Sequence, residues 1–539
     1  MPAEPSPPAL TAAQQEALDA AWKPAFNPWV VALTVTLATF MEVLDTSIAN
    51  VSLPHIAGSL SATQEEATWV LTSYLVSNAI VLPISGWLAS KIGRKRFYMS
   101  CVAAFIASSF LCGMAPSLGW LVFFRVLQGI GGGGLGPSEQ SILIDTFPPA
   151  KRGMAFAVYG MAVVLAPAIG PTLGGYITDH MSWRWVFFIN VPVGLVSLVL
   201  SSRIVQDPPY LQRLRAKSGR VDYIGLSLIA LGLGALEVVL DKGNEDDWFG
   251  SRFIVICSIV AVAALAAFII WELHQENPVV DIRLLGRRNF AVANVMMLVL
   301  GVTLLGSTVL LPLFLQTLMG YTAELAGMVL SPGGIVVILL LPLVGRLTGT
   351  VDLRFLIAFG FAVLSISLFY MTRHLYLDID FRTAMELRMF QSVGMAFLFV
   401  PINTLATLGL PREKGNAASG IINLFRNMGG DFGISLVSFL LLRRTAHHQS
   451  ILVRGAVSGD PTWERRLAGA AQGLAHMGSS AFAAQRQALG MLYGALVRQA
   501  MTLAYLDILW IMGAFTLLMV PAVFLMKRVR TSGGPAMVH

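Results

Sequence analysis

The chain has 539 residues, of which 55% are hydrophobic and only 12% are Asp, Glu, Lys or Arg. Soluble domains carry about 25% charged residues, so this composition predicts a polytopic membrane protein and leaves almost no room for a soluble domain. In such a protein the net charge of +7 reflects which loops carry Lys and Arg, and it does not indicate a nucleic-acid partner.

Predicted membrane-spanning helices account for most of the chain. A hydrocarbon core about 30 Å thick requires about 20 apolar residues per helix, and such runs recur from Trp29 to Met526. They predict an all-α integral membrane protein with fourteen spans, at 29 to 52, 66 to 89, 97 to 115, 118 to 145, 153 to 178, 184 to 202, 221 to 240, 252 to 272, 290 to 318, 323 to 347, 353 to 373, 384 to 408, 415 to 442 and 501 to 526.

The positions of the cations predict the orientation. Short loops on one side carry clusters of Lys and Arg residues, at 91 to 96, 151 to 152, 203 to 220, 283 to 288 and 412 to 414, whereas the short loops on the other side hold few cations and include the acidic DKGNEDDW, 241 to 248. Because cations concentrate in cytoplasmic loops, we expect both termini in the cytoplasm and the protein in the inner (plasma) membrane. Residues 1 to 28, which lack the features of a signal peptide, and 527 to 539 are then cytoplasmic tails.

A weak internal repeat divides the spans into two halves. PISG, 83 to 86, recurs as PLVG, 342 to 345; RVLQ, 125 to 128, recurs as RMFQ, 388 to 391; and PAKRG, 149 to 153, recurs as PREKG, 411 to 415. The members of each pair are about 260 residues apart, as in secondary transporters built from parallel repeats. The predicted domains are six-helix bundles at 29 to 202 and 286 to 526, joined by residues 203 to 285, which contain two extra spans.

Two oppositely charged residues are expected at the same depth in the membrane. At 1.5 Å per residue, Asp45 lies roughly 12 Å and Arg125 roughly 10 Å below the outer ends of their helices. An ionisable side chain in hydrocarbon costs at least ~2.5 kcal/mol and normally finds a partner, so we expect an Asp45–Arg125 pair. Because the proton affinity of a carboxyl changes with its surroundings, the pair is a candidate for proton coupling; the alternative is a fixed structural ion pair.

Other polar residues are candidates for a substrate cavity. Glu42 lies one turn inward of Asp45 on the same helix face, nearest the middle of the bilayer, where transporter sites lie. There it would attract cationic lipophilic compounds, or it would be a protonated helix contact. The remaining candidates are polar residues of the fourth span and of the second half: Gln128, Arg388, Gln391, Arg426 and Asp431.

The only long outer loop is expected at 443 to 499, in the second bundle. Trp463 to Leu474 and Phe482 to Val497 show amphipathic spacing, which predicts helices that lie on the membrane surface or meet a partner. A periplasmic surface loop without a partner is the alternative.

Five segments carry sequence motifs: LDTSIANVSLP, 44 to 54; GWLASKIGRK, 86 to 95; LVFFRVLQGIGGG, 121 to 133; APAIGPTLGG, 166 to 175; and WRWVFFINVPVG, 183 to 194. Together they resemble the major facilitator superfamily, specifically the fourteen-helix drug:proton antiporters of the EmrB/QacA type. The resemblance extends over nearly the whole chain. It implies the major facilitator fold, with two six-helix bundles plus two inserted helices.

The resemblance also implies roles for motif residues. The loop motif, with Gly86, Gly93 and Arg94, is expected to switch conformation, and Asp145 is expected to compensate partly for Ser90, which stands where the family usually has Asp. The antiporter motif is expected to make a tight contact between the halves that prevents leak, or simply to pack helices. Its residues are Pro167, Gly170, Pro171, Gly174 and Gly175.

The function implied by the resemblance is proton-coupled multidrug efflux by alternating access. The protein would be a secondary active transporter and not an enzyme, with no cofactor or metal, because the proton gradient drives it. The implied partners are small hydrophobic substrates, protons, the lipid bilayer, an EmrA-like periplasmic adaptor and a TolC-like outer-membrane channel, without nucleic acid. The alternatives are a dedicated exporter of one metabolite, such as a fatty acid or siderophore, and a passive channel.

Overall fold

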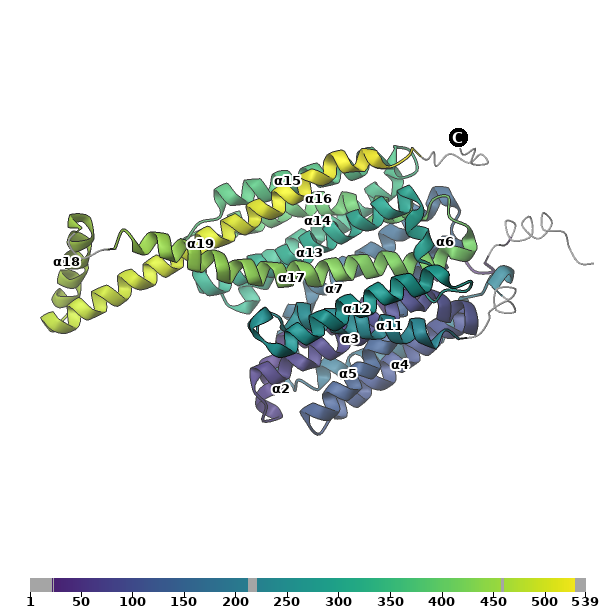
Figure 1. The fold of residues 1–539 in the computed structure, drawn as a ribbon, viewed down its shortest axis with the longest axis horizontal. Helices are drawn as coiled ribbons and strands as arrows, with labels where there is room; N and C mark the ends of the chain where they lie inside the picture. Colours follow the sequence, from purple (N-terminus) through teal and green to yellow (C-terminus); the bar gives the residue numbers. More distant parts are fainter. Residues whose placement is uncertain (1–21, 23, 212–220, 457–459, 529–539) are drawn as a thin grey trace, which may run out of the picture.

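A computed structural model of the chain describes residues 22, 24–211, 221–456 and 460–528. Long helices run side by side through most of the molecule (Figure 1). The tails expected at 1 to 28 and 527 to 539 lie mostly outside the described residues, and so do the loop cations between 212 and 220.

The first half consists of helices from Pro28 to Ile204. Gly-rich sequence around Gly133 and Gly134 divides the expected fourth span into α5 and α6, and the sixth is divided into α8 and α9 at Ile189. The bounds are α2 Pro28–Ser59, α3 Gln64–Ile92, α4 Arg94–Met114, α5 Leu118–Gly132, α6 Leu135–Thr146, α7 Pro149–His180, α8 Trp185–Phe188 and α9 Asn190–Ile204.

The inserted pair and the second half follow in the same order as in the sequence. The inserted helices are α11 Tyr223–Lys242 and α12 Arg252–His274, and α11 contacts both α3 and α17. The remaining helices are α13 Arg288–Met319, α14 Ala323–Leu347, α15 Leu353–His374, α16 Phe381–Thr407, α17 Gly415–Val453, α18 Pro461–His476 and α19 Ala481–Ala522, with short 3-10 turns η1 Trp248–Gly250, η2 Ile282–Gly286, η3 Arg412–Lys414 and η4 Val523–Leu525.

Within the described residues, thirteen helices are long and apolar enough to cross a membrane, when α5 with α6 and α8 with α9 are each taken as one span. The fourteenth span expected from the sequence is α17, which has 39 residues and runs along α13 (Figure 1). It does not meet the same criterion of composition, because it contains Arg426, Asp431, Arg443 and Arg444. Arg426 and Asp431, which lie in the middle of the helix, are partly buried against protein, as expected of charges inside a membrane, whereas Arg443 near its end is exposed.

The stretch expected as an outer loop is instead an extension of two membrane helices. α17 continues to Val453, and the second predicted amphipathic helix is continuous with the last span as the 42-residue α19. The first predicted amphipathic helix is confirmed as α18, which is capped by Asp460 and packs against α19. We call residues 443–499 the arm; it projects from one end of the bundle (Figure 1).

The end of the bundle opposite the arm carries Arg94 and Asp145, and we call it the loop-motif end. There the two halves are in close contact. Gly86 of α3 packs against α17 so tightly that an added Cβ would lie 2.7 Å from the backbone of Ala417. Likewise, an added Cβ on Gly345 of α14 would lie 3.0 Å from the backbone of Met154 in α7. These glycines let the backbones of the two halves approach closely, so this end is closed in the structure.

Candidate functional site

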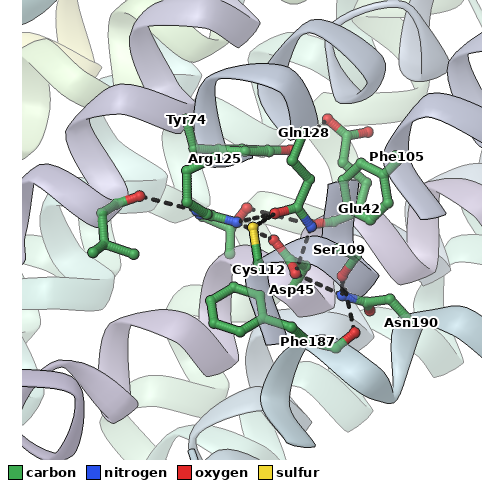
Figure 2. Close-up of polar contacts among 12 residues, drawn as sticks. Glu42, Asp45, Tyr74, Phe105, Ser109, Cys112, Arg125, Gln128, Phe187 and Asn190 are labelled. Carbon is green, nitrogen blue, oxygen red and sulfur yellow. Dashed lines mark hydrogen bonds and ion pairs between the residues drawn. The ribbon is translucent and has the colours of Figure 1, made fainter. Parts of the chain in front are cut away.

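A buried polar cluster surrounds Asp45 in the first half (Figure 2). The expected pair is formed, since Arg125 Nη1 lies 2.6 Å from Asp45 Oδ2 and both side chains are fully buried. The other carboxylate oxygen accepts from Gln128 Nε2 at 2.9 Å and from Asn190 Nδ2 at 2.6 Å. Asp45 therefore accepts hydrogen bonds from three side chains on two other helices: Arg125 and Gln128 of α5, and Asn190 of α9.

Arg125 is in turn held by neutral groups. Its Nε donates to the carbonyl oxygen of Val70 at 2.9 Å, and its Nη1 also donates to Gln128 Oε1 at 2.8 Å. Asn190 donates a second bond, to Ser109 Oγ at 3.0 Å. Hydrogen bonds to the other groups of a buried ion pair offset the cost of burying it, and here only Nη2 of Arg125 is without one among the residues that the structure describes. The network therefore fixes α2, α5 and α9 relative to one another. Sequence reasoning missed Asn190, although it lies in the WRWVFFINVPVG segment.

Tyr74 joins this cluster to Glu42 (Figure 2). Its ring centre lies 4.3 Å from Arg125 Cζ, a cation–π geometry, and its hydroxyl donates to Glu42 Oε1 at 3.4 Å. Asn78, one turn along α3, donates to the same oxygen at 3.1 Å. Movement of Tyr74 would therefore disturb both carboxyl groups.

A further buried acid that sequence reasoning missed is Glu139 on α6. It is fully buried, and the hydroxyl of Thr39 donates to its Oε2. Its only sequence signal is an acid inside the GPSEQS run that ends the fourth span. That signal was obscured because the span seemed to be one continuous helix, which gave no indication of where α6 turns toward α2.

The second half contains a matching cluster without the acid. Arg388 Nη1 donates to Gln391 Oε1 at 2.7 Å, as Arg125 does to Gln128, and its Nη2 donates to Thr308 Oγ1 at 3.0 Å. The spacing that relates Arg125 to Arg388 also relates Asp45 to Thr308. In the described part of the chain, the acceptors of Arg388 are all neutral. Among the described residues, equivalent positions of the repeat therefore hold an ion pair, Asp45–Arg125, in the first half and a buried cation without a carboxylate partner, Arg388, in the second.

The remaining cavity candidates lie in two different places. Arg426 of α17 interacts electrostatically with Glu42 of the other half and lies 5.9 Å from the ring centre of Phe399. Asp431, five residues further along α17, instead interacts with Glu237 of the inserted helix α11. Glu42 and Arg426 thus interact electrostatically between the halves, whereas Asp431 belongs to the contact with the inserted pair.

The loop-motif residues form a second buried ion pair. Arg94 Nη1 lies 2.7 Å from Asp145 Oδ2, with both side chains 2% exposed, while Ser90 Oγ donates to a carbonyl of its own helix at 2.7 Å. Asp145 thus lies where it can replace the missing motif acid. Tyr210 also donates to Asp145 Oδ2, at 2.6 Å, and burial raises the pKa of its hydroxyl, so it stays protonated and remains a donor.

The turn before this pair needs a glycine. Gly93 joins α3 to α4 with a φ of 98°, in the region that side chains rarely adopt. The resulting turn lets the backbone N–H of Lys95 donate to Asp207 Oδ1 at 2.9 Å. The loop is therefore anchored on the segment that follows α9.

The antiporter motif packs α7 within its own half. A Cβ at Gly170 would overlap the side chain of Ser47, and one at Gly174 would lie 3.0 Å from Ile48 Cγ2. Gly175 has open space around it, and Pro167 and Pro171 lie inside the continuous helix. The two glycines thus contact α2, just beyond Asp45. The same motif also meets the other half, since a Cβ on Gly327 of α14 would lie 3.8 Å from Thr172 Oγ1, and near the loop-motif end α7 meets α14 through Gly153 and Thr348.

Comparisons with known proteins agree with this architecture. The Major Facilitator Superfamily profile matches residues 35–434. Multidrug export protein EmrB of Escherichia coli (strain K12) is 35% identical over 505 residues, 94% of this chain and 96% of that protein. EmrB of Haemophilus influenzae is 42% identical over 78% of this chain and 82% of its own length. Fatty acid resistance protein FarB of Neisseria gonorrhoeae is 37% identical over 94% and 97%.

Two solved structures share the fold. The human organic anion transporter MFSD10 (TETRAN) has a TM-score of 0.55 at 14% identity, covering 77% of this chain and 94% of its own. The proton:xylose symporter XylE gives 0.55 at 14% identity, covering 88% and 94%. With the profile spanning most of the chain, this multi-pass membrane protein is a secondary transporter rather than an enzyme, and it belongs to the major facilitator superfamily.

Proposed function

We propose that this protein exports hydrophobic toxic compounds in exchange for protons, by alternating access across the inner (plasma) membrane, with both termini in the cytoplasm. The observation that carries the proposal is the buried Asp45, held by Arg125, Gln128 and Asn190. Protonation would remove the charge that Arg125 pairs with and loosen α2 from α5. Loss of the proton would restore the pair, so proton binding and helix packing are coupled.

The test uses purified protein in proteoliposomes with an imposed pH gradient and ethidium, a hydrophobic cation, as the probe. An antiporter concentrates ethidium against its gradient and stops when a protonophore collapses the pH difference. A passive channel would only equilibrate ethidium, with or without the protonophore, and that result would contradict the proposal.

A fatty-acid exporter is a second candidate, which two observations favour. The FarB relative is named for fatty acid resistance, and Arg388 is a buried cation with neutral partners, which suits a carboxylate substrate. In that case the two six-helix bundles proposed from the sequence would bind different substrates. The first would bind cations at Glu42, and the second would bind carboxylates with Arg388, Gln391 and Arg426.

Charge selectivity separates the two candidates. Glu42→Gln is expected to lower ethidium transport about tenfold and leave laurate transport unchanged, because a hydrogen bond to a charged group contributes about 1.5–3 kcal/mol. Arg388→Gln, the matched change in the other half, is expected to do the reverse if fatty acids are carried. The measurement is the initial rate for each probe in the same proteoliposomes. Equal loss of both probes in Glu42→Gln would rule out charge recognition at that residue.

The arm is the proposed contact with an EmrA-like adaptor and, through it, a TolC-like channel. Large apolar side chains are exposed there, among them Phe482 at 73% and Met491 at 60%, and exposed apolar groups beside charged ones are typical of interaction surfaces. Phe482→Ser with Met491→Ser is expected to leave ethidium transport in proteoliposomes unchanged and to reduce the ethidium resistance of cells that express adaptor and channel. Phe249→Ser, 71% exposed on another loop, is the control, and unchanged resistance in the arm variant would contradict the role.

A further inference from the structure

Glu139 carries a carboxyl group that takes no part in the Asp45–Arg125 ion pair. It lies on α6 with no exposed surface, one residue before Gln140, which bonds Asn423 of the other half at 3.3 Å. Thr39 donates to its Oε2, and its Oε1 is buried without a hydrogen-bond partner. One carboxyl oxygen of Glu139 therefore accepts a hydrogen bond, and the other accepts none from the described residues.

The surroundings of Glu139 do not compensate a negative charge. The ionisable side chains that interact with it are themselves acidic or neutral: Glu42 from α2, Tyr98 from α4 and Tyr159 from α7. Two cations lie in this region, and both interact with other groups. Arg426 of α17 interacts with Glu42 and Tyr159, and Arg94 of α4 is paired with Asp145 and donates to the carbonyl oxygen of Ser141. An isolated carboxylate is far more costly to bury than a neutral acid, so this site favours a protonated carboxyl.

Glu139 also belongs to a row of carboxyl groups along α2. Positions 39, 42 and 45 follow one another in three-residue steps, so each is a neighbour of the next on the helix surface. Thr39 donates to the carboxyl of Glu139, and the next two positions are the acids Glu42 and Asp45. The row descends from the Arg125 pair toward the loop-motif end, which Gly86 closes against α17.

We propose that Glu139 is a second proton-binding residue, distinct from Asp45, and the last of this row before the cytoplasm. The proposal rests on the proposed proton-coupled function. In the closed structure a proton forms an O–H bond with the carboxylate at Oε1, and the neutral acid keeps its bond from Thr39. When the halves separate at the loop-motif end, the Gln140–Asn423 bond breaks, water reaches α6, and the O–H bond gives its proton to water.

The test is infrared difference spectroscopy on the purified full chain without substrate, recorded as the pH is raised. Wild type is expected to lose the carbonyl band of a protonated carboxylic acid, and Glu139→Gln is expected to lack that band from the start. The amide keeps an acceptor for Thr39, and Glu386→Gln, a surface acid paired with Arg382, serves as the control. The same band in Glu139→Gln, or a wild-type band that never changes with pH, would overturn the proposal.

A second variant covers the case in which Glu139→Gln does not fold. Thr39→Val removes the donor to Oε2, so the carboxylic acid band is expected to move to higher frequency; a band at the wild-type position would contradict the assignment. Neither spectrum depends on transport. A protein that shows the Glu139 band yet does not couple ethidium to protons would therefore overturn the proposed function alone, and the reverse result would overturn only the role of Glu139.

Discussion

Asp45→Asn is expected to abolish proton-driven accumulation of ethidium in proteoliposomes, to the level of protein-free liposomes. The amide cannot take up and release a proton, so the Arg125 cluster would remain in one protonation state throughout the cycle. Exchange of labelled for unlabelled ethidium needs no net proton movement and is expected to continue. Full accumulation, together with proton release on adding ethidium, would show that Asp45 is not the coupling residue.

This result must be separated from misfolding. Asp45→Asn leaves Arg125 buried without its counter-charge, and breaking a buried ion pair by removing one partner costs about 3–5 kcal/mol. The double variant Asp45→Asn with Arg125→Gln removes both charges and the cost of the unpaired cation. It is expected to unfold at a temperature closer to wild type than the single variant while still failing to accumulate ethidium. Recovery of transport in the double variant would mean that the single variant failed through instability.

The Asp45–Arg125 pair could be predicted because each residue lies on a long helix whose ends can be recognised in the sequence. The constant rise of the helix converts residue number into depth, and two unpaired charges at one depth favour each other. The repeat placed Arg388 beside Gln391 for the same reason, since RVLQ and RMFQ are helical turns at equivalent positions.

Other parts of the site depend on information that single helices do not carry. Glu139 reaches Thr39 only because the chain breaks between α5 and α6, and Asn190 reaches Asp45 only because α9 packs beside α2. The arm was missed in part because hydropathy detects where α19 becomes apolar, near residue 501, and not where the helix begins at Ala481. The contact of Gly170 and Gly174 with α2 could not be predicted from the sequence, because small residues indicate close approach but not which helix approaches.

The charges of the two halves are unlike, although the halves are repeats. Asp45 of the first half is neutralised by Arg125 within that half, whereas Glu42 interacts with Arg426 of the second half, so the charge interaction between the halves is that of Glu42 with Arg426. Under the proposed function, attraction between Glu42 and Arg426 is strongest when Glu42 is ionised, and it weakens when Glu42 is protonated or binds a cationic substrate. Proton and substrate can therefore compete for one electrostatic contact, which is the requirement for exchange.

Gly86→Ala is expected to hold the loop-motif end apart and slow transport. An added Cβ would lie 2.7 Å from the backbone nitrogen and Cα of Ala417, where no flexible side chain can move aside. Overpacking a tight contact costs about 1–3 kcal/mol, which shifts the balance between closed and open forms by roughly fivefold to more than a hundredfold. Distances between spin labels at Arg96 and Thr350, exposed on the two halves at this end, are expected to lengthen.

A matched control exists at the same contact, because Gly415 of α17 has no neighbouring atom within 4 Å of an added Cβ. Gly415→Ala adds the same methyl group on the facing helix, where there is room for it. It is expected to leave both the label distances and ethidium transport at wild-type values. If Gly86→Ala behaves like Gly415→Ala, the α3–α17 contact has room to relax and does not set the closed state. If only Gly86→Ala opens this end, then the close approach of the two backbones is what seals Glu139 and Asp45 from the cytoplasm during the cycle.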